Sequence, residues 1–110
     1  MLIYGTQKLS KLKLSLADFE VQASKAARIM KSLGNEKRLM ILCKLIELGE
    51  MSVILMAEAV GLSQSALSQH LARMREEELV DFRREGQTLF YRVSDPNVNR
   101  IIKTLQSIFC

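Results

Sequence analysis

The sequence has no tryptophan, and only 5% of its 110 residues are aromatic. Because 48% of the residues are hydrophobic, the chain has enough apolar material for one core. That core must be built from aliphatic side chains and methionine. A chain of this length is typical of one domain, and it leaves no room for a catalytic domain beside a regulatory one.

Long apolar runs are also missing. No segment approaches the roughly 20 consecutive apolar residues that a membrane-spanning helix requires. The opening stretch MLIYGTQKLSKLKLSL has neither a clear apolar centre nor a small-residue cleavage site, so no secretory signal is expected. These features predict a cytoplasmic protein with no membrane partner.

Histidine and cysteine are scarce. The chain has one histidine, His70, and two widely separated cysteines, Cys43 and Cys110. A permanent disulfide is not expected in a reducing compartment, and CxxC chemistry does not apply. So few ligands rarely form a specific transition-metal site, and we expect no metal and no other cofactor. The sequence also lacks a glycine-rich phosphate loop and a nucleophile with a matching base, so it does not predict an enzyme.

The net charge of +4 and the pI of about 9.3 suit a nucleic-acid partner. The charge is unevenly distributed along the chain. Residues 1–44 contain nine Lys and Arg against three acidic residues, and the remainder contains seven against nine. Charge alone therefore does not identify the partner.

Apolar spacing and capping residues predict five helices. Residues 1–14 show no clean period and are predicted to form an N-terminal arm, ahead of a domain over residues 15–110. The helices are expected from Ser15 to Leu33, Asn35 to Gly49, Ser52 to Val60, Ser63 to about Glu78, and Asp95 to the C-terminus. In the second helix the expected buried stripe is Leu39, Leu42, Cys43 and Ile46.

The period changes after Leu79. The segments LVDFRRE and TLFYRVS approximate the alternation of two strands, with Glu85–Gln87 as the turn between them. The predicted fold is therefore mainly α with a small β-hairpin, in the order four helices, two strands, one helix. Two short helices around Gly61 followed by a hairpin are typical of a winged helix-turn-helix.

The fourth helix has the composition of a DNA-reading helix. Ala66, Leu67, Leu71 and Met74 form its inner face, so the outer face is polar. Glutamine can pair with adenine, serine can reach base edges or phosphates, and the first N–H groups of the helix can meet a phosphate. The predicted DNA-binding residues of this helix are Ser63, Gln64, Ser65, Ser68, Gln69 and Arg73.

The hairpin, or wing, supplies further candidates. Arg83 and Arg84 precede the turn and Gln87 follows it. We predict that these residues flank the minor groove or bind phosphates of double-stranded operator DNA. The alternative interpretation is an ordinary solvated strand edge.

The stretches KSLGNEKRLMILCKL, VGLSQSALSQHLARMREEELV and REGQTLFYRVSD resemble the ArsR family of bacterial winged-helix repressors. The resemblance covers roughly residues 20–110. It implies a homodimer through the first and last helices, and the apolar stripes of these two helices independently favour such an interface. Many members sense metals through cysteines in the first helix of the helix-turn-helix, or through Asp and His on the last helix. Here MSVILMAEA has no cysteine and the last helix no histidine, although a metal site shared across a dimer remains open.

Judged by position alone, Cys43 is a small core residue and Cys110 an incidental exposed thiol. However, ILC on the second helix and IFC at the end of the last helix resemble a dithiol subfamily of the ArsR family. That resemblance implies a redox-sensing pair, in which reactive sulfur species or oxidants link Cys43 to Cys110 and lower the affinity for DNA. The link would be a disulfide or a longer polysulfide bridge.

Three alternatives remain open at this point. In the first, the chain is an ArsR-type regulator with two inert cysteines that acts as a metal-independent repressor. In the second, it is an anti-silencer, which raises transcription by competing with a silencing protein. In the third, it is a winged helix that binds proteins and not DNA, but the polar outer face from Ser63 to Arg73 argues against this.

Overall fold

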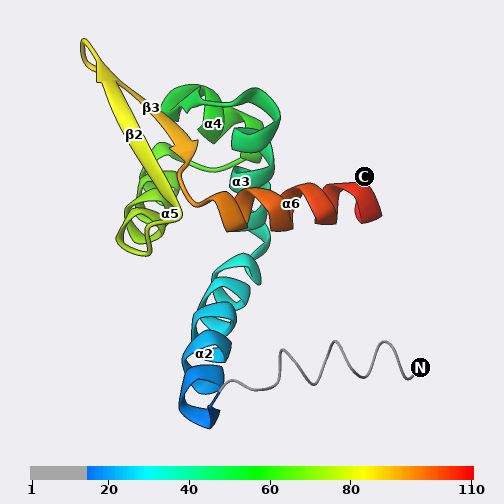
Figure 1. Ribbon diagram of the computed structural model, residues 1–110. Helices are drawn as coiled ribbons and strands as arrows, with labels where there is room; N and C mark the ends of the chain where they lie inside the picture. Colours follow the sequence, from blue (N-terminus) through cyan, green and yellow to red (C-terminus); the bar gives the residue numbers. More distant parts are fainter. Residues whose placement is uncertain (1–14) are drawn as a thin grey trace. The chain divides into compact units, whose positions relative to one another are not determined.

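The computed structural model describes residues 15–110 (Figure 1). The predicted N-terminal arm, residues 1–14, lies outside the described residues. The chain divides into two compact units, one that ends at Lys31 and one formed by Ser32–Cys110. Among the described residues, no helix is both long enough and apolar enough to cross a membrane.

Helix α2, Leu16–Leu33, begins where the sequence predicts. The Ser15 hydroxyl oxygen accepts a hydrogen bond from the Asp18 backbone N–H at 3.1 Å, which satisfies one of the free donors at the start of the helix. Nearly all side chains up to Lys31 are exposed, and burial begins only at Ser32 and Leu33. The apolar residues of α2 therefore form an uncovered surface.

The second unit has the winged helix-turn-helix fold that the sequence predicts. The predicted order of helices and strands is confirmed, with one addition, the two-residue strand β1. The elements are α3 (Glu36–Leu48), β1 (Met51–Ser52), α4 (Val53–Val60), α5 (Gln64–Glu76), β2 (Val80–Glu85), β3 (Thr88–Val93) and α6 (Pro96–Phe109).

Side-chain caps define the starts of the helices in this unit. Asn35, Ser52, Ser63 and Asp95 each accept a hydrogen bond from a backbone N–H in the first turn of the helix that follows. Helix α5 ends at Glu76, earlier than the predicted Glu78. The reason is that Glu78 adopts a left-handed conformation with φ +62°, which no helix can continue through.

The three strands form one antiparallel sheet in the order β1-β3-β2. Strand β1 was not predicted, because two residues are too short to show alternation; Met51 pairs with Tyr91 of β3. In the hairpin, Glu85 pairs with Thr88 across the turn, and Gly86 has φ +63°. A glycine with positive φ at this position is typical of a type II′ turn. The tip of the hairpin projects beyond the helices (Figure 1).

Aliphatic side chains from every helix of the second unit fill the core. Helix α3 packs against α4, α6 and β3, and it buries Arg38, Ile41, Leu42 and Leu45. The predicted stripe was therefore wrong at Leu39, Cys43 and Ile46, which are only half-buried. The apolar run LMILCKLI contains two adjacent helical stripes, and the packing of three neighbouring elements selects between them. The remaining fully buried residues include Met56, Val60, Leu67, Leu71, Met74, Val98 and Ile102.

Candidate nucleic-acid interface and cysteine pair

Helix α5 presents one polar face to solvent. Leu67, Leu71 and Met74 are buried as predicted, and Ala66 is half-buried. Because these residues share one side of the helix, the opposite side is left free. All six predicted residues are exposed: Ser65, Ser68, Gln69 and Arg73 lie on that free side, and Ser63 and Gln64 lie at the N-terminal end of the helix.

The turn before α5 is fixed by backbone and side-chain hydrogen bonds. Gly61 adopts a left-handed conformation with φ +67°, and the Leu62 N–H donates to the Ala57 carbonyl at 3.0 Å. The Lys37 ammonium donates to the Val60 carbonyl at 3.0 Å, so α3 also holds the end of α4. These contacts set the direction in which α5 leaves the core.

A buried polar network lies beside the other end of α5. The Arg38 guanidinium donates to the Ser32 hydroxyl at 3.2 Å, and that hydroxyl donates to the Glu77 carboxylate at 2.7 Å. Arg38 and Glu77 also form an ion pair at 3.9 Å. Within the described part of the chain, Arg38 Nε is buried without a hydrogen-bond partner. No feature of the sequence predicts this network, because an arginine in an amphipathic helix is normally expected on the exposed face.

His70 is the one histidine of the chain, and it lies on α5. Its side chain is half-buried. Burial lowers the pKa of His70 below its ordinary value, and the positive charges of Arg38 and Arg73 lower it further. The imidazole is therefore neutral near pH 7 and adds no charge to the polar face of α5.

The three predicted residues of the wing have different surroundings. Arg83 forms ion pairs with Glu50 and Glu85, and the Arg83 guanidinium lowers the pKa of the Glu50 carboxyl. Arg84 and Gln87 are exposed, and Arg84 forms no ion pair with any residue in the range 15–110. Sequence reasoning missed Glu50, because its position beside the wing depends on the unpredicted strand β1.

The end of α6 places Cys110 in the same region as Cys43, although the two residues are far apart in the sequence. Cys43 lies on α3, Cys110 caps the C-terminal end of α6, and both are free thiols. The Gln106 side-chain amide donates to the Cys43 carbonyl at 3.5 Å, so the last turns of α6 lie beside Cys43. Cys43 is half-buried and Cys110 is exposed. The prediction that Cys43 lies in the core was therefore wrong.

The pKa of the Cys43 thiol also depends on the nearby Cys110. Burial raises the pKa of the Cys43 thiol most, and the negative charge of the Cys110 thiolate raises it further. A hydrogen bond from Gln106 opposes these effects by lowering the pKa. Cys43 is therefore mostly a neutral thiol at pH 7. Within residues 15–110, no three His, Cys, Asp or Glu side chains are grouped so that they could hold a metal ion.

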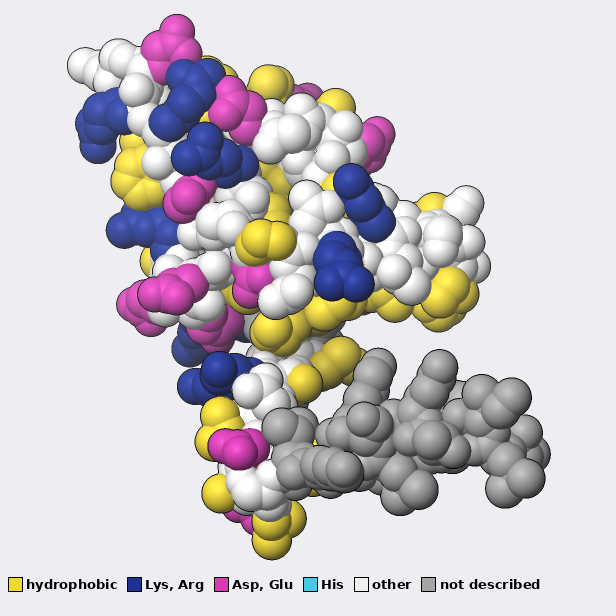
Figure 2. Space-filling model, in the orientation of Figure 1, with side chains coloured by type: hydrophobic (Ala, Val, Ile, Leu, Met, Phe, Trp, Pro, Cys, Tyr) yellow, Lys and Arg dark blue, Asp and Glu magenta, His cyan; other side chains and the backbone are white. Residues whose placement is uncertain are grey.

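Apolar side chains reach the surface on the last helix. Val98 and Ile102 of α6 are buried, but Ile108 is 65% exposed and Phe109 is 80% exposed. The space-filling view shows hydrophobic side chains at the surface along the part of the molecule that α6 occupies (Figure 2). On α2, the exposed large apolar residues are Leu16, Phe19, Val21 and Met30.

Comparison with known proteins identifies the family. The profile described as bacterial regulatory protein, arsR family, matches residues 35–81. The transcriptional activator HlyU of Vibrio cholerae serotype O1 is 42% identical over 97 residues, which are 88% of this chain and 89% of HlyU. The chain belongs to the ArsR family. The HTH-type transcriptional regulator YgaV of Escherichia coli K12 is also 42% identical, over 86% of this chain and 96% of YgaV.

Solved structures of ArsR-family proteins agree with the fold. Reduced HlyU from Vibrio cholerae superposes with a TM-score of 0.82 at 43% identity, covering 86% of this chain and 99% of HlyU. The repressor BigR from Xylella fastidiosa superposes with a TM-score of 0.77 at 35% identity, covering 88% of this chain and 98% of BigR. This ArsR-family chain is thus a DNA-binding transcriptional regulator with a winged helix-turn-helix fold, and not an enzyme.

Proposed function

We propose that this regulator is a homodimeric repressor that binds operator DNA through α5 and the wing, and that linkage of Cys43 to Cys110 releases it. The observation that carries the DNA-binding part is the exposed polar face of α5 in an ArsR-family fold. We assign the base and phosphate contacts to Ser63, Gln64, Ser65, Ser68, Gln69, Arg73 and the wing.

The composition of the α5 face supports major-groove binding. Gln64 and Gln69 carry amides that can pair with adenine, and Arg73 supplies a cation for a phosphate or guanine. Glu76 and Glu77 at the C-terminal end of α5 lie away from the major groove, because recognition helices insert their N-terminal residues first. Ser63 caps Ala66, so its hydroxyl both starts the helix and stands at the positive end of its dipole, where a phosphate binds favourably.

We propose that a second copy of the chain covers the exposed apolar surfaces of α2 and α6. Phe19 of α2 and Phe109 of α6 are too large and too exposed to be favourable in water. A homodimer buries both surfaces and provides two copies of α5. Two recognition helices reach successive major grooves when they lie about 34 Å apart.

The pair of thiols supports a switch driven by sulfane sulfur. The exposed Cys110 thiolate attacks a sulfane sulfur atom of a polysulfide and becomes a persulfide, while the shortened polysulfide leaves as an anion. The Cys43 thiolate then attacks the Cys110 sulfur, forms the disulfide and expels hydrosulfide. The two thiols supply two electrons, and the sulfane sulfur atom accepts them. If both cysteines are first persulfidated, the same chemistry gives a longer bridge.

Linkage would lower DNA affinity through the position of α6. A covalent bond between α3 and the end of α6 shifts α6, which we place in the dimer interface. A small change there alters the distance between the two α5 helices, and a mismatch of a few ångströms with the grooves weakens binding. Both cysteines must be reduced before the inducer arrives. The cytoplasm keeps thiols reduced, and it also contains the operator DNA.

Fluorescence anisotropy on a duplex from the chain's own promoter tests this proposal. Reduced protein should bind with strong salt dependence, and treatment with a polysulfide donor should weaken binding. The Cys43→Ser and Cys110→Ser proteins should bind the duplex, and the donor should not change their affinity. If the reduced protein binds and the donor changes nothing, the cysteines are inert. If it does not bind duplex DNA, the DNA-binding role is wrong for this chain.

The sign of regulation is a separate question, because repression and anti-silencing both require only that DNA is occupied. We favour repression, in line with the relative BigR, which is described as a transcriptional repressor. A promoter–reporter strain decides it: deletion of the regulator should raise expression from its own promoter. A fall in expression would indicate anti-silencing, which would agree with the relative HlyU, described as an activator.

A further inference from the structure

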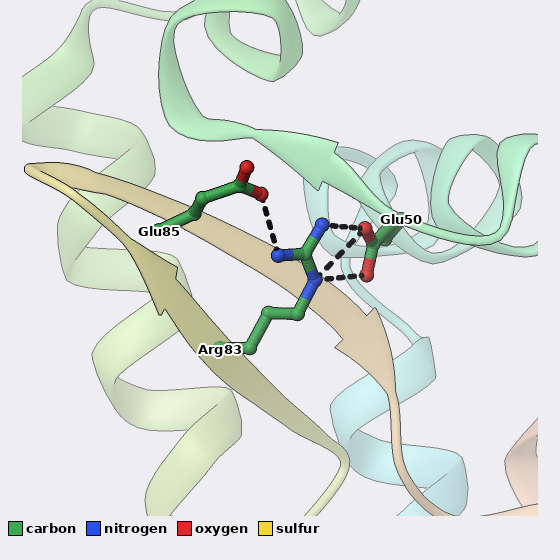
Figure 3. Close-up of polar contacts among 3 residues, drawn as sticks. All are labelled: Glu50, Arg83 and Glu85. Carbon is green, nitrogen blue, oxygen red and sulfur yellow. Dashed lines mark hydrogen bonds and ion pairs between the residues drawn. The ribbon is translucent and has the colours of Figure 1, made fainter.

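Three residues hold the Arg83 side chain, and Figure 3 shows the two carboxylates among them, Glu50 and Glu85. Its Nη2 donates to a Glu50 oxygen at 2.6 Å, and its Nε contacts both Glu50 oxygens at 3.1 and 3.2 Å. Its Nη1 donates to Glu85 at 2.8 Å, and its guanidinium carbon lies 4.6 Å from the centre of the Phe90 ring. All three guanidinium nitrogens are therefore used, and one positive charge faces two negative charges.

These contacts belong to one face of the three-stranded sheet. Arg83 pairs with Phe90 across β2 and β3, and Asp81 pairs with Arg92 on the same side, where their charged groups lie 2.7 Å apart. Glu50 immediately precedes β1 and joins this row from the far edge, where Arg92 also lowers the pKa of its carboxyl. This face therefore carries alternating charges that satisfy one another.

The opposite face of the hairpin packs toward the recognition helix. Phe82 contacts the Tyr91 ring at a centroid distance of 5.4 Å, and Arg75 of α5 lies 4.7 Å above the Phe82 ring. Because side chains alternate along a strand, Arg84 shares this face with Phe82 and lies nearer the tip. Arg84 is exposed, with no ion pair within the described residues.

We propose that Arg83 is a positioning residue that clamps the wing to Glu50, and that Arg84 is the wing cation that contacts the DNA backbone. This inference rests on the proposed DNA-binding function, and it gives the two neighbouring arginines different roles. A phosphate that approached Arg83 would have to displace two carboxylates. A phosphate that approaches Arg84 meets a cation with no ion pair among the described residues, on the side of the sheet that faces α5.

The clamp also fixes the wing to the helical framework. Glu50 follows α3 directly after the Gly49 cap, so its backbone is anchored by the helix end, where the Gly49 N–H donates to the Leu45 carbonyl at 2.7 Å. A bidentate contact from this anchored residue limits the swing of a two-stranded hairpin, which is only marginally stable by itself. The tip of the wing, and with it Arg84, is thereby held in position.

Salt-dependent DNA binding separates the two roles. Arg84→Gln should weaken binding and reduce the slope of log affinity against log salt by about one unit per protomer, as expected for a lost phosphate contact. Arg83→Gln should weaken binding about tenfold with an unchanged slope, because the freer wing must be ordered on binding while Arg84 still contacts its phosphate in the complex. Arg83→Lys should resemble Arg83→Gln, since lysine keeps the charge but cannot make the bidentate contact.

Glu50 gives the sharper variant, because the two roles predict opposite results. Glu50→Gln should weaken binding, and the double variant Glu50→Gln/Arg83→Gln should bind no worse than either single variant. Glu47→Gln is the matched control, since it removes one carboxylate near the end of α3 that pairs with Lys44 and not with the wing. If Glu50→Gln strengthens binding and steepens the salt slope, Arg83 is a DNA contact and the clamp proposal is wrong.

Hydrogen exchange of the free protein tests the clamp without DNA. Amides of residues 84–89 should exchange faster in Glu50→Gln than in the native chain, and Glu47→Gln should match the native chain. Unchanged exchange in Glu50→Gln would overturn the clamp even if the protein binds DNA. Faster exchange in a chain that fails to bind duplex DNA would support the clamp and refute the proposed function.

Discussion

At the scale of single residues, the most informative contrast is between Cys43 and Cys110. Both are free thiols near the contact of α3 with α6, but only Cys43 is half-buried, and burial and the neighbouring thiolate raise its pKa. A thiol reacts as the thiolate, so Cys43 is a poor first nucleophile at neutral pH. This is why we assign the first attack to Cys110 and the resolving step to Cys43.

Burial of Cys43, the largest cause of its raised pKa, gives a direct prediction. Alkylation of Cys43 by iodoacetamide, followed by mass spectrometry in Cys110→Ser protein, should be slower at pH 7 than alkylation of an unstructured cysteine peptide. It should accelerate through and above the ordinary thiol range, because the thiolate forms only at higher pH. Gln106→Leu should slow the reaction further, since it removes the hydrogen bond that lowers the pKa. Alkylation at the peptide's rate would contradict this assignment.

Arg38 supplies a second prediction at this scale. Arg38→Ala should lower the free energy of unfolding by roughly 1–3 kcal/mol, because it removes a buried arginine that bonds Ser32 and pairs with Glu77. Glu77→Gln should cost less than about 1 kcal/mol, since its amide oxygen can still accept from Ser32 and the ion pair is partly exposed. Urea denaturation measures both. A larger loss in Glu77→Gln than in Arg38→Ala would show that the charge of Glu77 holds the network.

At the scale of elements, the wing depends on the conformation of one glycine. Gly86 has φ +63°, and a Cβ atom added there would meet no atom within 4 Å. The requirement for glycine is thus conformational and not steric, because L-residues with side chains disfavour this region. The turn fixes the register that pairs Arg83 with Phe90 and Arg84 with Leu89.

Gly86→Ala should therefore lower the free energy of unfolding by about 1 kcal/mol, and Gly86→Asn should cost less, because asparagine tolerates positive φ. Thermal or urea unfolding measures the difference between the two variants. Both should weaken DNA binding in the order of their destabilisation if they loosen the wing. Equal stability of the alanine and native proteins would contradict the proposed turn.

At the scale of the whole molecule, the exposed apolar surfaces of α2 and of the end of α6 are those that we propose a second copy of the chain covers. Ile108→Glu should weaken dimer association at least tenfold, since it places a carboxylate in the proposed interface. Ile54→Glu on α4 is the matched control, because Ile54 is 64% exposed and Ile108 is 65% exposed. Sedimentation equilibrium measures both. If the two variants associate equally, the interface does not include the end of α6.

Much of the fold could be predicted because its signals are local. A capping side chain acts within one turn, so Asn35, Ser52, Ser63 and Asp95 marked the helix starts correctly. Glycines and the change of period marked the ends and the hairpin. The polar face of α5 followed from the spacing of Leu67, Leu71 and Met74, which repeat with the period of the helix.

The contacts around the candidate site were less predictable, because they join residues that are distant in the sequence. The apolar run on α3 allowed two buried faces, and only packing against α4, α6 and β3 decided between them. Strand β1 is too short to have a pattern, so neither the strand nor the Glu50 contact to Arg83 could be anticipated. The buried position of Arg38 likewise depends on Ser32 and Glu77 arriving from other elements.

By itself, the sequence determined the order of helices and strands, the polar face of α5 and the scarcity of ligands and catalytic groups, since each depends on neighbours within a few residues. Only the tertiary structure decided that Cys43 is half-buried near Cys110, and that Arg83 is ion-paired while Arg84 has no ion-pair partner within residues 15–110. The reason is physical: burial, pKa and ion pairing depend on the distance between side chains in space, and that distance is set when the elements pack.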